Sequence, residues 1–244
     1  MGEHRDSAST QARDWDDLAL VDPLWAVLAV EEKRDGGWDL DEFFATGEAD
    51  VGHMLATAAK LGRPARRERA LDFGCGVGRL TRALGLRFDE AVGVDVSERM
   101  LGHARRLNAH VPNLTFAAGD EPPPGLFDLV VANLVLQHLP SKALARVYIE
   151  RLVKAARRDG LVVFQLPTKV PLARRLQPRR RLYKPLRARV GAERLHAAGL
   201  HPVRVIALPE ADVLYTVEGA GATIAHAEDA GAAGLRYYVH HRSP

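Results

Sequence analysis

The sequence predicts an α/β fold in which a parallel β-sheet carries helices on both faces. Short apolar runs alternate with amphipathic segments between residues 69 and 166, as strands alternate with helices in such folds. The run at 128–132 is almost wholly apolar, which is typical of a strand buried on both sides. A glycine-rich turn at 74–78 joins one strand to the next helix. The length of 244 residues fits one domain with additions.

The same periodicity predicts the individual elements. The predicted strands cover residues 69–73, 91–95, 114–117, 128–132 and 161–166, with a closing pair at 222–227 and 235–240. The predicted helices begin near Pro23, Asp39, Val51, Gly78, Ser97, Ser141 and Pro209. A competing interpretation takes 192–198 as the last helix, but it leaves a long tail outside the sheet. The polar first twenty residues are expected to fray.

Charge is distributed unevenly along the chain. Residues 1–50 hold fourteen acids and four bases, whereas residues 174–189 hold eight bases and no acid. This basic stretch has three candidate roles: a solvated face, a contact for an acidic substrate, or a partner for the acidic N-terminal segment. Nucleic-acid binding needs more than arginines. Apolar residues within the stretch predict a helix with an apolar side, suited to a lid or a dimer contact: Leu176, Leu182, Tyr183 and Leu186.

Several functional classes are disfavoured by composition. The sequence has no run of about 18 apolar residues, so we expect no membrane span. Its polar, acidic start is unlike a secretory signal. Cys75 is the only cysteine, which excludes an internal disulfide, and the histidines lack metal-ligand spacing. We therefore expect a cytoplasmic protein with no metal site and no membrane partner.

The glycine loop departs from the dinucleotide-binding pattern. Gly74, Gly76 and Gly78 lie two residues apart, whereas the dinucleotide fingerprint places its third glycine three positions after the second, where this chain has Arg79. Asp72, at the end of the preceding strand, is also unusual for a phosphate loop. The departure favours a ligand with an amino-acid moiety over NAD.

Five segments in this order resemble the motifs of the class I S-adenosylmethionine-dependent methyltransferases, of the bacterial small-molecule type. They are residues 70–81, 92–97, 118–120, 127–140 and 158–165. The resemblance implies a Rossmann-like sheet of seven strands with helices on both faces and the last strand antiparallel. It also implies S-adenosyl-L-methionine as the cofactor, and a small-molecule acceptor methylated on oxygen or nitrogen.

On this resemblance the chain divides into four segments. They are an N-terminal helical cap (1–66), an S-adenosylmethionine-binding core (67–166), a basic insertion or lid (167–208), and a C-terminal helix and strand pair that completes the sheet (209–244). The residues that choose the acceptor are expected in the cap and the insertion. A homodimer is one alternative for the oligomeric state.

The resemblance also assigns the cofactor contacts. The loop at the helix start favours the cofactor's carboxylate, Asp72 meets its ammonium group directly or through water, and Asp95 accepts both ribose hydroxyls. The other expected contacts are Gly74, Cys75, Gly76, Gly78, Val96, Met100, Gly119, Asp120, Asn133 and Leu134. Phe44 and Gly47 are expected to close over the site. Packing within the fold explains Val96, Met100, Phe44 and Gly47 equally well.

His138 is the candidate general base, because imidazole takes up protons near neutral pH and this residue follows the fourth predicted strand. A histidine merely packed in the fold is the alternative. The rival functions are an RNA- or protein-modifying methyltransferase and a protein that binds the cofactor without transferring methyl. Residues 133–136 lack the Asn/Asp-Pro-Pro-aromatic signature of amine-modifying nucleic-acid enzymes, which disfavours the first rival.

Overall fold

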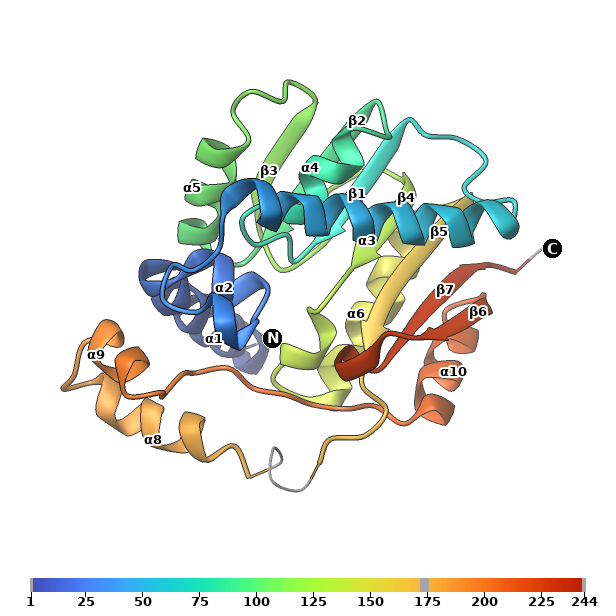
Figure 1. Ribbon diagram of the computed structural model, residues 1–244. Coiled ribbons are helices and arrows are strands. Elements are labelled where there is room, and N and C mark those ends of the chain that lie inside the picture. The colour runs from blue at the N-terminus through green and yellow to red at the C-terminus, as the bar shows by residue number, and fades with distance from the viewer. Residues whose placement is uncertain (1, 172–175, 243–244) are drawn as a thin grey trace.

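One seven-stranded sheet organises the molecule (Figure 1). The computed structural model describes residues 2–171 and 176–242. The strand order is β3-β2-β1-β4-β5-β7-β6, and β7 runs antiparallel to both β5 and β6. The predicted fold class is thus confirmed. The strands are β1 (Arg69–Phe73), β2 (Glu90–Asp95), β3 (Leu114–Ala118), β4 (Phe127–Ala132), β5 (Ala156–Leu166), β6 (Ala222–Asp229) and β7 (Leu235–His241).

Helices cover the sheet on both faces. On one face pack α6 (Lys142–Ala155) and α10 (Glu210–Gly219), and on the other pack α3 (Leu40–Lys60) and α4 (Arg79–Gly85). Successive strand residues alternate between these two cores, as the period of a strand requires. In β5, for example, Val162 joins the α6 side and Val163 joins the α3 side.

Most predicted helix starts are confirmed, several of them by side-chain caps, but the separate start near Val51 is wrong, because α3 runs unbroken from Leu40 to Lys60. The side chain of Asp39 accepts from the Glu42 N–H at 3.0 Å, and Ser97 caps α5 (Glu98–Leu107) by accepting from the Met100 N–H at 3.1 Å. The helix that covers the last strands is α10, as the main interpretation has it. The competing helix also exists, as α9 (Ala192–Ala197), but it lies in the insertion.

The expectation of a frayed N-terminus is wrong. Helix α1 (Gly2–Val21) precedes α2 (Pro23–Val27) and the short turn η1 (Glu31–Lys33). Leu18 and Ala19 are buried, and α1 contacts α5 and α9. Asp14 and Asp17 of this helix pair with the basic insertion, and Asp16 accepts from the Ser97 hydroxyl at the start of α5.

The insertion carries α8 (Pro178–Arg187) as well as α9. Figure 1 shows both helices on the side of the molecule that α1 and α2 occupy. Two arginines of the predicted basic stretch, Arg174 and Arg175, lie outside the described residues. The remaining short turns are η2 (Leu136–His138) and η3 (Gly231–Ala233).

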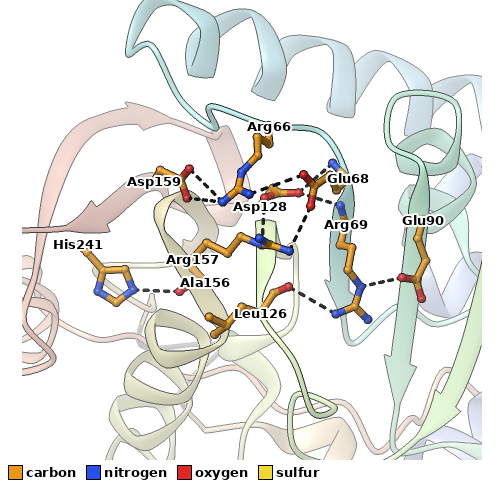
Figure 2. A network of polar contacts seen from close by, with 10 residues as sticks. All are labelled: Arg66, Glu68, Arg69, Glu90, Leu126, Asp128, Ala156, Arg157, Asp159 and His241. Carbon is orange, nitrogen blue, oxygen red and sulfur yellow. Dashed lines mark hydrogen bonds and ion pairs between the residues drawn. The ribbon is translucent and has the colours of Figure 1, made fainter.

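The amino ends of the strands are closed by a network of polar contacts around Asp128 (Figure 2). This buried carboxylate accepts from the N–H groups of Glu68 and Arg69, both at 2.8 Å, and pairs with the Arg157 guanidinium at 3.3 Å. A buried acid needs such partners to stay charged. The network ties β1, β4 and β5 together at this end, and the opposite end is hollow.

Candidate active site

A cavity of about 940 Å³ lies at the carboxyl ends of the central strands. Open α/β sheets bind ligands at this edge. Its floor includes Asp95 at the end of β2, Asn133 after β4, Gln165 in β5 and Arg236 in β7. Residues of α1, α2, α8 and the segment 201–205 also line it, as do single residues of α3 and α6.

The loop between β1 and α4 requires its glycines. Gly74, Gly76 and Gly78 have φ values of 75°, 54° and 83°, in the left-handed region that favours glycine. A Cβ at Gly74 would lie 2.4 Å from a methyl group of Val135. The loop is tied to the neighbouring strand, because the N–H of Gly74 donates to the Val94 carbonyl at 2.7 Å. The backbone therefore reaches the cavity without side chains in front of it.

Asp95 joins this loop to the start of α5. One carboxylate oxygen accepts from the Gly76 N–H and the other from the Ser97 N–H, each at 2.9 Å. Burial raises the pKa of Asp95, and these backbone donors oppose the rise. A carboxylate offers about four acceptor positions. Asp95 therefore keeps acceptor capacity toward the cavity, enough for a pair of ligand hydroxyls.

The chain is strained where it leaves β4. Leu134 has a φ of 60°, a conformation that a branched side chain rarely adopts. The neighbouring Asn133 holds a buried side-chain oxygen without a hydrogen-bond partner. Both residues line the cavity. Strain and an unpaired polar atom at one place indicate a position shaped for a ligand.

Most of the predicted site residues line this cavity. Those that do are Gly74, Gly76, Asp95, Val96, Met100, Gly119, Asn133, Leu134 and His138. Asp120 follows Gly119 directly, but it is outside the lining.

Asp72 and Cys75 lie behind the loop rather than in the cavity. The Asp72 carboxylate accepts from the Thr81 hydroxyl at 2.6 Å, and burial raises its pKa to about 6. The Cys75 sulfur lies 2.9 Å from where a Cβ on Gly93 would stand, and burial raises the pKa of this thiol well above its ordinary value. Both side chains pack the loop against β2 and α4.

The predicted closing residues also lie outside the lining. Phe44 is buried, with the Arg82 guanidinium 4.4 Å from its ring centre. Gly47 lets α3 approach α4, since a Cβ there would lie 2.4 Å from the Arg79 carbonyl oxygen. Gly78 similarly packs against Asn108, at 2.8 Å from an added Cβ. For Phe44 and Gly47 the geometry favours the packing explanation.

His138 is held in one orientation and one tautomer. Its Nδ1 lies 2.6 Å from the backbone oxygen of Arg204, which can only accept, so Nδ1 carries the proton. The neutral ring therefore keeps its lone pair on Nε2. The Trp15 ring packs edge-on against it, with 5.5 Å between ring centres. Burial lowers the pKa of His138 below the ordinary 6.5, which favours the neutral form.

Other lining residues did not stand out in the sequence. They are, among others, Trp15, Trp25, Asp50, Gln165, His201 and Arg236. For Gln165 and Arg236 a signal existed, because a polar amide and an arginine interrupt apolar strands. The two tryptophans come from the N-terminal helices and lie in no motif, so only their folded positions identify them.

The acidic N-terminal helix and the basic insertion pair with one another. The Arg187 guanidinium donates twice to Asp17, at 2.8 Å each, and Tyr183 donates to the same carboxylate at 2.7 Å. Lys184 pairs with Asp14 at 2.9 Å. These contacts confirm one of the three roles considered for the basic stretch. They fasten α8 beside the cavity.

The described residues provide neither a metal site nor a membrane-spanning helix. Across residues 2–171 and 176–242, no group of three His, Cys, Asp or Glu side chains is placed to hold a metal ion. Among the helices of these same residues, none is long and apolar enough to cross a membrane.

The part of the chain that carries the glycine loop and Asp95 is similar to known proteins. Residues 47–205 match the model of the methyltransferase domain family. The chain belongs to this family. Trans-aconitate 2-methyltransferase of Methylobacterium nodulans is 32% identical over 75% of this chain and 68% of its own length. Ribosomal protein L11 methyltransferase of Neisseria gonorrhoeae is 31% identical over 66% of this chain and 55% of its own length.

Solved structures share the fold. Magnesium protoporphyrin IX methyltransferase from Synechocystis PCC 6803, crystallised with bound SAH, has a TM-score of 0.64 at 22% identity, covering 96% of this chain and 100% of that one. The N-methyltransferase NodS from Bradyrhizobium japonicum has a TM-score of 0.59 at 17% identity, covering 96% of this chain and 99% of that one. The protein is thus an S-adenosylmethionine-dependent methyltransferase with the Rossmann-like fold that its motifs predict.

Proposed function

We propose that this methyltransferase transfers methyl to an oxygen or nitrogen of a small molecule bound inside the cavity. The observation that carries the proposal is that one cavity extends from the glycine loop and Asp95 to His138 and Gln165. Cofactor and acceptor can therefore meet in one enclosed space. S-adenosylmethionine supplies an electrophilic methyl group when bound, so that positioning the acceptor is the main task of the protein.

The cofactor half is built around the loop and Asp95. We assign the ribose hydroxyls to Asp95, the adenine to Val96 and Met100, and the amino-acid end to the loop at 74–78. Asn133 and Leu134 would line the methyl-bearing end. Asp72 would influence the ammonium group indirectly, from its place behind the loop. Asp120, which lies next to the lining residue Gly119, would interact with the adenine. We assign Phe44 and Gly47 to holding α3 in place.

His138 is our candidate for removing the acceptor's proton. Its Nε2 lies 3.3 Å from the Gln137 amide nitrogen. The lone pair on Nε2, the buried ring and the fixed tautomer suit a neutral base near pH 7. With the cofactor bound as methyl donor, Nε2 would take up the proton that the acceptor atom loses when it accepts the methyl group. The Arg204 carbonyl and Trp15 hold the ring for this task.

A small acceptor suits the site better than a macromolecule. Helices α1 and α8 are fastened to one another beside the cavity, which restricts access for a protein or RNA segment. The relatives named for trans-aconitate and for ubiquinone biosynthesis point the same way, whereas those named for ribosomal protein L11 represent the rival. We place the protein in the cytoplasm. A homodimer through the exposed Leu182 and Leu186 of α8 stays a proposal.

The decisive experiment measures cofactor binding. We expect S-adenosylhomocysteine, but not NAD, to bind in isothermal titration calorimetry. Asp95→Ala removes the acceptors for two hydroxyls, so its Kd should rise about 100-fold or more. Asp95→Asn keeps the shape of the side chain and one acceptor oxygen, so its Kd should lie between those of the parent and of Asp95→Ala. Asp89→Ala, just before the other end of β2, is the matched control.

Binding of NAD alone would overturn the proposal. So would an Asp95→Ala protein that is folded and binds S-adenosylhomocysteine as the parent does. Binding without any labelled product, across a broad set of small acceptors, would instead favour a protein that holds the cofactor without transferring methyl.

A further inference from the structure

At the seam between β5 and β7, two polar side chains each keep one atom without a hydrogen-bond partner. Gln165 and Arg236 face one another across the antiparallel pair, 4% and 7% exposed, and both line the cavity. The Gln165 side-chain oxygen and the Arg236 Nε are buried without hydrogen-bond partners. Buried polar groups are rarely left without a hydrogen-bond partner in a folded protein, so two such atoms beside a cavity indicate a ligand.

The charge of Arg236 is only partly neutralised. Its guanidinium donates to Glu228 at 3.2 Å and lies 3.9 Å from Asp50. Both acids have other partners, because Asp50 pairs with Arg79 at 2.8 Å, and Glu228 accepts from Tyr238 at 2.8 Å. His53 also lies 2.9 Å from Glu228. Neither carboxylate therefore belongs to Arg236 alone.

The lining of the cavity carries further positive charge. Two arginines of α8, Arg179 and Arg180, contribute to it, whereas burial lowers the pKa of His201 to about 4 and keeps that ring neutral. The acids in the lining are Asp50, already paired with Arg79, and Asp95 at the cofactor end. An anionic ligand group near Arg236 would thus meet positive charge and the unpaired Nε–H donor of Arg236.

The position of the seam also separates it from the cofactor. In the sheet order, β1 and β4 lie between β2, which carries Asp95, and β5. Three strand spacings amount to roughly 14 Å, at about 4.8 Å each. Asn133 and His138, which follow β4, lie between the two ends. A molecule held at the seam would therefore present another of its atoms toward His138.

We propose that Arg236 and Gln165 bind a carboxylate of the acceptor, so that the substrate is a small organic acid methylated elsewhere in the molecule. The inference rests on the proposed function, which makes this cavity the acceptor site. Arg236 provides charge-assisted donors to the carboxylate. Gln165 provides an amide that can turn its NH₂ group toward the same anion.

Matched acid and amide probes test the charge requirement. Benzoate, succinate and tricarballylate, each beside its primary amide, are titrated in calorimetry with S-adenosylhomocysteine saturating. We expect at least one acid to bind tenfold or more tightly than its amide. If every acid binds no better than its amide, the proposal is overturned. Titration of S-adenosylhomocysteine alone reports separately on the proposed function.

Variants then locate the anion. Arg236→Gln removes the positive charge. Gln165→Glu places a carboxylate, which repels the carboxylate of the ligand, beside Arg236 while leaving the ion pairs of Arg236 intact. For each we expect acid binding to weaken about 10- to 100-fold, with the Kd of S-adenosylhomocysteine unchanged. Arg146→Gln breaks a surface pair with Asp212 and is the control. Should Arg236→Gln fail to fold, Gln165→Glu decides, and parental acid binding in Gln165→Glu overturns the proposal.

Discussion

At the scale of single residues, His138 combines a fixed tautomer with a lowered pKa. The Nδ1–H group donates a hydrogen bond to the Arg204 carbonyl, so Nε2 is the only ring nitrogen left to accept a proton. We expect His138→Ala to lower kcat by about 10²- to 10⁴-fold, the usual contribution of a positioned base. The Kd of S-adenosylhomocysteine should stay within a fewfold, since this ring lies away from Asp95.

The pH profile distinguishes a base from a packing residue. Because burial lowers the pKa of His138, protonation and loss of rate should set in below pH 6.5 in the parent. This acid limb should disappear in His138→Ala. Turnover within a fewfold of the parent would rule out proton removal by this residue. His103→Ala, on α5 outside the cavity lining, serves as the control.

At the scale of elements, two glycines of α3 differ in their surroundings. A Cβ at Gly47 would lie 2.4 Å from the Arg79 carbonyl oxygen, whereas one at Gly52 meets nothing within 4 Å. We expect Gly47→Ala to lower the free energy of unfolding by about 1–3 kcal/mol, because the two helices must separate. Gly52→Ala should raise it by about 0.5–1 kcal/mol through helix propensity alone. Urea unfolding measures both, and equal effects would contradict the close approach.

The contact of α1 with α8 is the second prediction at this scale. Asp17 accepts from Tyr183 and twice from Arg187, so Asp17→Ala removes the centre of the contact. We expect faster hydrogen exchange in α8, because local opening costs less free energy once these bonds are lost. Added salt should act in the same direction on the parent. Glu48→Ala, an exposed acid of α3, should leave α8 unchanged. Unaltered exchange in Asp17→Ala would show that packing alone holds α8.

At the scale of the whole molecule, the charge pattern and the fold explain one another. The acidic N-terminal helix and the basic insertion are more than 150 residues apart in the chain, yet Asp14 and Lys184 lie 2.9 Å apart. Sequence reasoning considered this pairing beside two other roles. It also predicted fraying of the helix that the pairing holds, because an isolated polar segment has no apolar face from which docking can be inferred.

Much of the cavity lining beside the glycine loop could be predicted from the sequence. Gly74 and Asn133 directly follow a strand, Asp95 ends one, and parallel strands bring their carboxyl ends to one edge. The same closeness to the loop explains why Asp72 and Cys75 were expected to contact the cofactor, although both side chains lie behind the loop. A motif tells which residues are near the loop, but not whether a side chain faces the ligand or the core behind it.

The fold class, the family and the position of the glycine loop could be predicted from the sequence, because each motif is a short strand–turn unit whose geometry is local. Which residues line the rest of the cavity depends on the tertiary structure. Trp15, Trp25, Gln165, His201 and Arg236 come from distant segments and share no spacing. Long-range packing brings them to one cavity, and neither the period of a helix nor that of a strand encodes such a meeting.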